Sequence, residues 1–392
     1  MSRWWKVALA VGIAVPAVGL RLSGAHLAAS AAMPVFGLAV VAASFLLVWA
    51  AEAVQHDISG NLATAILAVI AVLPEYAVDL YFAWSAGHVP ENAHYAAANM
   101  TGSNRLLLGL GWPFVALLFA WGVRRRGEKP RGLKLHEGRR VDLGFLGMAS
   151  LYSLLIPFTR RLAWYDALVL LALFGAYLWR AAQGERSEPA LVGVAKQIGD
   201  LPRRTRRIMV AALFAAAASI VLIAAEPFAG ALVAGGKELG IDEFLLVQWL
   251  APLASEAPEL LVAAVLALRG HDDSALGMLL SAKVNQWTLL VGSLPIAFIA
   301  GGGTASGIAL DARQTEEFIL TAAQTILGFA VLVDLRLAIW ESVALLALFA
   351  AQFPFPDPAV RLGFSAAYAV LALALLLRSR RELPAIAGAL YR

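Results

Sequence analysis

Long apolar runs are the feature that most constrains how this chain can fold. Runs of 18 or more mainly apolar residues recur along the sequence, and a helix needs about that length to cross ~30 Å of hydrocarbon. Hydrophobic residues make up 60% of the chain and charged residues 15%, against about 45–50% and about 25% in soluble domains. The alternating pattern of a transmembrane β-barrel is absent. Because lipid offers the backbone no hydrogen bonds, the sequence predicts an all-α integral membrane protein.

Turn signals divide the chain into about twelve predicted transmembrane helices. Glycine and proline clusters separate several of them, as at 87–90 and 301–303. The segment at 91–122 is longer than one crossing needs, so part of it is expected outside the hydrocarbon. For residues 1–22 we favour a retained helix, with a signal peptide as the alternative. The predicted segments are 4–22, 29–53, 60–84, 91–122, 142–159, 163–182, 208–235, 241–268, 274–300, 314–334, 337–353 and 359–378.

Basic residues indicate the orientation of these segments. The stretches 124–140 and 186–207 carry eight and six Lys or Arg, and two predicted segments lie between them, so both stretches fall on one face. The positive-inside rule makes that face cytoplasmic, with both termini on it. The net charge of +4 therefore reports orientation, and no nucleic-acid partner is expected. The predicted setting is a bacterial-type inner or plasma membrane, with the lipid bilayer and small cations as partners.

An internal repeat relates the two parts of the chain. Each part has an Ala-Ala-Glu triplet (50–52 and 224–226) and, further on, a Pro-Glu pair (Pro74-Glu75 and Pro258-Glu259). A polar run follows each Pro-Glu pair within the next predicted segment. Five segments per repeat place the two repeats in opposite orientations, with a site near the midplane. The predicted divisions are an extra N-terminal helix (1–28), a first five-helix repeat (29–183), a basic linker (184–207), a second five-helix repeat (208–354), and an extra C-terminal helix with a basic tail (355–392).

Acidic residues beside the helix-breaking prolines are the candidate cation ligands. A proline inside a helix frees a backbone carbonyl, and a neighbouring carboxylate supplies the charge that a dehydrated cation needs. Glu75 and Asp79 are four residues apart and Glu256 and Glu259 three apart, so each pair shares a helical face. The alternative is a structural salt-bridge network, which the repeat-related positions disfavour. Further oxygens are expected from Asn99, Ser103, Ser255, Asn285 and Gln286, although each alone is as consistent with an interhelical hydrogen bond.

At these positions the sequence resembles the cation/Ca²⁺ exchanger superfamily, the sodium/calcium exchanger-like antiporters. The family's two repeats carry Gly-Thr-Ser-x-Pro-Glu on one helix and Gly-Ser-Asn on the next. Pro74-Glu75 with Gly102-Ser103-Asn104 matches the first repeat, and residues 255–259 with 281–286 match the second. The resemblance implies ten core helices in two inverted repeats and transport by alternating access. It also implies that Glu75 and Glu259 are the principal metal-binding glutamates.

Two basic residues depart from the family pattern. Arg105 and Lys283 stand next to or within the polar runs. A guanidinium keeps its proton, so we expect Arg105 to be a fixed cation that occupies one of the four carboxylates. A buried lysine releases its proton more easily than one in water, so Lys283 could give up a proton when a metal ion enters. In the motifs themselves, Ala71-Val72 replaces Thr-Ser and Leu107 replaces a carboxamide or carboxylate.

The predicted function is secondary active antiport of Ca²⁺ or a monovalent cation against Na⁺ or H⁺. One alternative is a Na⁺(K⁺)/H⁺ antiporter in which Lys283 and Arg105 replace cation sites, and a lesser one is a cation channel. The sequence has no cysteine, no His-Glu-x-x-His or Gly-x-Ser-x-Gly motif and no P-loop, so neither enzymatic activity nor ATP-driven transport is expected. No cofactor is expected beyond the transported cations, and the oligomeric state is left open.

Overall fold

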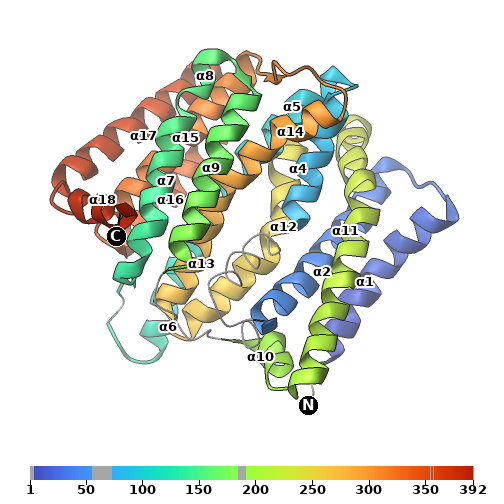
Figure 1. Cartoon of the computed structure of the whole chain (residues 1–392), viewed down its shortest axis with the longest axis horizontal. Coiled ribbons are helices and arrows are strands. Elements are labelled where there is room, and N and C mark those ends of the chain that lie inside the picture. Colours follow the sequence, from blue (N-terminus) through green and yellow to red (C-terminus); the bar gives the residue numbers. More distant parts are fainter. Residues whose placement is uncertain are drawn as a thin grey trace.

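A computed structural model shows a bundle of α-helices, with α1 and α2 at one side and α17 at the other (Figure 1). It describes residues 4–54, 73–129, 131–183, 191–353, 355 and 357–391. Within these ranges, eight helices are long and apolar enough to cross a bilayer. Large apolar side chains such as Leu222 and Val370 are 79% and 66% exposed, which suits contact with lipid. The prediction of an all-α integral membrane protein is confirmed.

The first part of the chain begins with α1, and its third predicted segment is described only from Leu73 onward. The rest of that segment, with Ala71-Val72, lies outside the described residues. Pro74 and Glu75 therefore fall in the first turn described for α4. The elements are α1 (Trp4–Ser23), α2 (Ala29–Val54), α4 (Leu73–Ala86), η1 (Pro90–Asn92), α5 (Ala93–Leu106), η2 (Leu107–Gly111), α6 (Trp112–Arg125), β1 (Leu133–Lys134), η3 (Glu137–Arg139), α7 (Arg140–Ser153), α8 (Ile156–Thr159), β2 (Arg161–Leu162) and α9 (Trp164–Ala181).

The second part contains the longest described helix, α11, and two short helices, α10 and α18, that the hydropathy pattern did not predict. The elements are α10 (Gly193–Gly199), α11 (Arg203–Leu239), α12 (Glu243–Leu268), α13 (Asp272–Asn285), η4 (Gln286–Leu290), α14 (Val291–Ala300), β3 (Ile308–Ala309), α15 (Ala312–Leu332), β4 (Arg336–Leu337), α16 (Ile339–Ala351), α17 (Pro358–Arg378) and α18 (Leu383–Tyr391).

Each part of the chain contains one long helix that is interrupted by a π-helical turn. In the first part η2 joins α5 to α6, and in the second part η4 joins α13 to α14. η2 begins at Leu107, just after the polar run of the first part, and η4 begins at Gln286, the last residue of the polar run of the second part. π turns are rare, and they occur frequently at functional sites. The π turns therefore lie at corresponding positions in the two parts of the chain.

The contacts between helices follow the same correspondence. α6 packs against α16, and its counterpart α14 packs against α9; α2 packs against α11, and α7 against α15. The short strands behave alike, because β1 pairs with β4 and β2 pairs with β3, both antiparallel. Exchanging the two parts of the chain turns one strand pair into the other. In Figure 1, α8 and the loop after α14 lie at the top, whereas the loop after α6 lies at the bottom.

α5 and α12 approach each other closely at Gly102. A Cβ atom at this position would collide with the backbone carbonyl of Gln248 in α12. Beside this contact, the Gln248 Nε2 donates a hydrogen bond to the Thr101 hydroxyl at 3.5 Å. Glycine at position 102 therefore sets how near the polar run of α5 can lie to the second Pro-Glu helix.

We predict that Gly102→Ala lowers the free energy of unfolding, because the added methyl group must push α5 away from α12. Overpacking of this kind costs about 1–3 kcal/mol. Gly363→Ala in α17 is the matched control, since a Cβ there meets nothing within 4 Å, and alanine favours a helix over glycine by about 1 kcal/mol. Thermal unfolding of both variants in detergent is the measurement. Equal melting temperatures for the two variants would contradict the prediction.

Candidate cation site

Four acidic side chains come together where α4 meets α12. Glu75 and Asp79 project from α4, and Glu256 and Glu259 project from α12. The first three are 5%, 0% and 4% exposed, and Glu259 is partly buried. Glu75 interacts electrostatically with each of the other three. The structure thus gathers the acids that the sequence proposes as ligands, although the pair on α4 lies more than 170 residues before the pair on α12 in the chain.

The side-chain amide of Gln286 joins two of these carboxylates. Its Nε2 donates hydrogen bonds to the Glu256 Oε1 at 2.7 Å and to the Glu75 Oε1 at 3.2 Å. Gln286 is the first residue of the π turn η4, so the backbone irregularity places this amide between the two Pro-Glu helices. One donor therefore holds together two acids from different parts of the chain.

Lys283 also lies beside the acids. Its side chain is 0% exposed, and it interacts electrostatically with Glu256 and Glu75. Its ammonium group donates hydrogen bonds to the backbone oxygen of Asn104 and, at 2.9 Å, to the Asn104 Oδ1. A buried ammonium is stable only with such partners. Lys283 thus adds one positive charge next to the carboxylates while its hydrogen bonds go to α5.

Arg105 has a different partner from the one expected. Its guanidinium forms an ion pair with Glu317 of α15 and donates a hydrogen bond to the Gln352 Oε1 at 2.8 Å. The expectation that it occupies one of the four carboxylates is therefore wrong. Successive residues of an α-helix point about 100° apart, so Arg105 faces away from the side on which Asn104 meets Lys283. With Lys283 alone beside them, the four acids and this lysine together carry a formal charge of −3 at full ionisation.

Several oxygens at this place have no donor. Within the described ranges, the Oδ1 of Asn99, the Glu256 Oε2, the Asn285 Oδ1 and the Gln286 Oε1 lack a hydrogen-bond partner. The Asn99 side-chain amide is directed at the Asp79 carboxylate from α5. Buried polar atoms are nearly always hydrogen-bonded in proteins. A cluster of bare carboxylate and amide oxygens has the chemistry that Ca²⁺ and other hard cations prefer.

The two predicted serines are placed differently. The Ser103 hydroxyl donates to the backbone oxygen of Met100 at 3.1 Å, and it lies next to Glu75. The Ser255 hydroxyl donates to the backbone of its own helix, to the carbonyls of Ala251 and Pro252. Ser103 can therefore reach a cation held by Glu75, whereas in this arrangement Ser255 is engaged within α12.

The acids do not by themselves form a compact metal cage. Among the described residues, no three His, Asp or Glu side chains are placed to hold one metal ion together. A bound Ca²⁺, which takes six to eight oxygens, would need the amide oxygens as well as the carboxylates. It would also need the Gln286 Nε2 to leave its place between Glu75 and Glu256, because a donor group repels a cation.

Sequence reasoning left Asn104, Tyr76 and Gln248 out of the candidate site. Asn104 accepts from Lys283, the Tyr76 hydroxyl donates to the backbone oxygen of Asn285 at 3.4 Å, and Gln248 contacts Thr101. Asn104 belongs to the Gly-Ser-Asn motif of the first repeat. Lys283 occupies the corresponding position in the second repeat, so alignment of the two repeats could have identified this pair as a contact.

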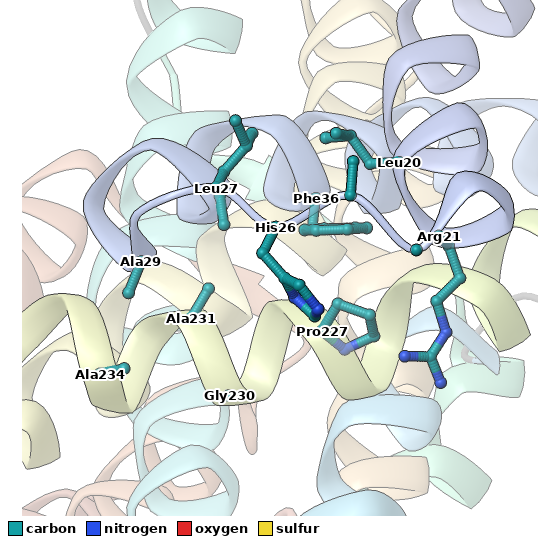
Figure 2. Close-up of a pocket in the computed structure, with 13 residues that line it drawn as sticks. Leu20, Arg21, His26, Leu27, Ala29, Phe36, Pro227, Gly230, Ala231 and Ala234 are labelled. Atoms are coloured by element: carbon teal, nitrogen blue, oxygen red, sulfur yellow. The ribbon is translucent and has the colours of Figure 1, made fainter.

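A separate pocket of about 260 Å³ lies between α11 and the α1–α2 connection (Figure 2). Arg21, His26, Phe36 and Pro227 are among its lining residues. Arg21 forms an ion pair with Glu226 at 2.6 Å, and both side chains are about half exposed. None of the four acids lines this pocket, so it is distinct from the candidate cation site.

Comparison with known proteins decides the family. The model of the family described as "Sodium/calcium exchanger protein" matches residues 29–182 and 209–353. This chain belongs to the sodium/calcium exchanger family. A crystal structure described as the H⁺/Ca²⁺ exchanger CAX is 39% identical over 100% of this chain and 98% of its own, with a TM-score of 0.93. Membership in this family explains the all-α membrane fold. The members are transporters and not enzymes.

Two more distant structures share the exchanger fold. The Ca²⁺/H⁺ antiporter protein YfkE has a TM-score of 0.61 at 16% identity, covering 96% of this chain and 99% of its own. The sodium-calcium exchanger NCX_Mj has a TM-score of 0.55 at 16% identity, covering 88% of this chain and 100% of its own. No curated protein sequence gave a match. The family match, together with the eight apolar helices of the described residues, makes this exchanger a multi-pass integral membrane protein.

We predict that Gln286→Leu weakens cation binding in this exchanger, because leucine cannot supply the Oε1 that the amide would turn toward the cation. Losing a group that orients ligands typically costs about 10–100-fold in metal affinity. Isothermal titration of the purified protein with Ca²⁺ measures the change. Gln183→Leu, at an exposed position after α9, is the matched control. Unchanged affinity in Gln286→Leu would remove the amide from the site.

Proposed function

We propose that this exchanger is a secondary active antiporter that moves Ca²⁺ against H⁺ by alternating access. The observation that carries the proposal is the cluster of buried carboxylate and amide oxygens without donors, next to the buried ammonium of Lys283. The likeness to an H⁺/Ca²⁺ exchanger over the whole chain supports the choice of ions. The transported cations are substrates, and no resident cofactor is proposed.

Glu75 and Glu259 are the proposed principal metal ligands, one from each Pro-Glu pair. Glu256, Asp79, Asn99, Ser103, Asn285 and Gln286 supply further oxygens, with Ser255 as a candidate only after a change of its hydroxyl hydrogen bond. A cation that enters draws the carboxylates together by Coulomb attraction, which is strong where water is excluded. The Gln286 amide then leaves its position between Glu75 and Glu256 and turns its oxygen toward the cation.

Lys283 is the proposed proton-coupling group. A divalent cation among the acids repels the ammonium of Lys283, which interacts electrostatically with both Glu75 and Glu256. Loss of the ammonium proton removes that repulsion. The neutral amine can still bond to Asn104, because an amine keeps N–H donors. Binding of Ca²⁺ and release of H⁺ are thereby linked at neighbouring groups.

Na⁺ or K⁺ exchange against H⁺ is the second candidate. This alternative requires that Lys283 and Arg105 both replace cation sites among the acids. Arg105 pairs instead with Glu317, so only Lys283 remains to support this alternative. A cation channel, the lesser alternative, would conduct without any counter-ion.

The proposed topology is twelve crossings in two inverted five-helix repeats, 29–183 and 208–354, with α1 and α17 outside them. The π turns at corresponding places, the exchange-related strand pairs and the family match in two segments support this arrangement. An odd number of crossings per repeat gives opposite orientation. The charge distribution supports cytoplasmic termini, and a bacterial-type inner or plasma membrane is the proposed setting.

Ion flux into proteoliposomes tests the proposal. We expect that an acidic interior drives Ca²⁺ uptake from a more alkaline medium, because outward H⁺ flow supplies the free energy. Uptake should collapse when a protonophore removes the pH gradient, and an outward Na⁺ gradient alone should not sustain it. Uptake driven only by Na⁺ would make this a Na⁺/Ca²⁺ exchanger. Proton-coupled Na⁺ or K⁺ uptake without Ca²⁺ transport would support the second candidate.

We predict that Lys283→Ala uncouples Ca²⁺ movement from H⁺, because the variant has no ammonium proton to release at the site. The pH gradient should no longer drive net Ca²⁺ uptake, while Ca²⁺/Ca²⁺ exchange continues. Lys237→Ala is the control, since Lys237 is 67% exposed at the end of α11. Unchanged H⁺ coupling in Lys283→Ala would rule out this role for Lys283.

A further inference from the structure

A second cluster of buried charged groups joins α5, α15 and α17. Arg105 of α5, Glu316 and Glu317 of α15, and Arg361 of α17 are 3%, 7%, 0% and 8% exposed. Gln352, directly after α16, is 3% exposed and belongs to the same cluster. Arg361 is buried in the first turn of α17.

Glu317 is the centre of this cluster. One of its carboxylate oxygens pairs with Arg105 and the other pairs with Arg361. The Arg361 Nε also lies 3.7 Å from the Glu316 Oε1. The Arg105 guanidinium, besides its bond to Gln352, lies over the Trp249 ring of α12, 5.0 Å from the ring centroid. A single carboxylate thus connects an arginine of a core helix with an arginine of the C-terminal helix.

The charges of the cluster balance. Two arginines face two glutamates, so the group is formally neutral. Removing one member of such a buried set leaves an uncompensated charge, and that is far more destabilising than removing an oppositely charged pair. The position of each side chain therefore depends on the presence of the others.

The cluster is connected to the candidate cation site through the backbone of α5. Arg105 directly follows Asn104, the acceptor for Lys283, and Ser103, which lies next to Glu75. α15 also contacts this turn of α5 through its backbone, because the Gln324 Nε2 donates a hydrogen bond to the backbone oxygen of Arg105 at 3.2 Å. α15 itself packs along α17. A displacement of Arg105 would therefore move the ligand-bearing turn of α5.

We propose that Arg361 and Glu317 are positioning residues for the cation site, and that α17 is part of the transport unit. α17 lies beyond residue 353, where the family match ends, yet it supplies the charge that completes the cluster. Through Glu317 that charge fixes Arg105, and through Arg105 it fixes the turn of α5 that faces Glu75 and Lys283. The transport consequence rests on the proposed function, whereas the structural consequence for α5 does not.

Arg361→Gln tests this role. It leaves two glutamates with one arginine, so we expect Arg105 to shift and α5 to loosen. Amide hydrogen exchange in peptides from α5 should increase by about tenfold. In proteoliposomes the apparent KM for Ca²⁺ should rise by about tenfold, with a smaller change in maximal rate, because misplaced ligands weaken binding. Arg361→Lys keeps the charge but has one nitrogen in place of the two that contact Glu316 and Glu317, so we expect an effect smaller than that of Arg361→Gln.

The double variant Glu316→Gln with Arg361→Gln separates charge from packing. It removes one charge of each sign and keeps the ion pair between Arg105 and Glu317, so we expect it to recover most of the Ca²⁺ affinity lost in Arg361→Gln. Arg21→Gln is the matched control, because Arg21 forms a half-exposed ion pair with Glu226 at 2.6 Å, and it should change neither measurement.

Two results would overturn the proposal. Hydrogen exchange of α5 in Arg361→Gln that equals the wild type would show that the cluster does not position α5. Failure of the double variant to recover would show that Arg361 acts through its volume and not its charge. If the wild type transports no Ca²⁺, the proposed function fails, but the hydrogen-exchange comparison still tests the cluster.

Discussion

The side-chain amide of Gln286 is the contact on which the central architecture depends. It lies between Glu75 and Glu256, which come from different parts of the chain and would repel each other if both were ionised. Its position in turn depends on the π turn η4 and on α5, whose close approach to α12 at Gly102 brings Asn99, Ser103 and Asn104 into the same region. The π turn, the glycine contact between α5 and α12, and the hydrogen bonds of Gln286 therefore place these polar groups close together.

Much of the fold could be predicted because lipid imposes simple rules. Apolar runs of sufficient length mark the helices, and prolines next to glutamates mark the place where the helices α4 and α12 carry charge. The repeat relates Glu75 to Glu259 and so predicts that they share one site. The structure places both near Glu256. Residues 60–72 of the third predicted segment lie outside the described residues, so that part of the segment stays a prediction.

The partners of the basic residues could not be predicted, because they depend on how each helix is rotated about its axis. Lys283 and Arg105 look alike in the sequence, as single basic residues in polar runs. In space Lys283 faces the acids and Asn104, whereas Arg105 faces Glu317. Glu317 and Arg361 gave no signal of their own, since each lies near the end of an apolar segment where a charge is ordinarily solvated.

The π turns have a consequence for how such a helix tolerates change in length. Each one takes one extra residue into a single turn, so the residues before and after it keep nearly the angular phase of an uninterrupted helix. Deleting one residue from Leu107–Gly111 would therefore restore a regular turn and leave Trp112 and Val115, both 0% exposed, on the face that they now occupy. Deleting one residue from a regular turn of α6 would instead rotate everything after it by about 100°. The π turns are thus the places where these two long helices can lose a residue and still present the same faces to their neighbours.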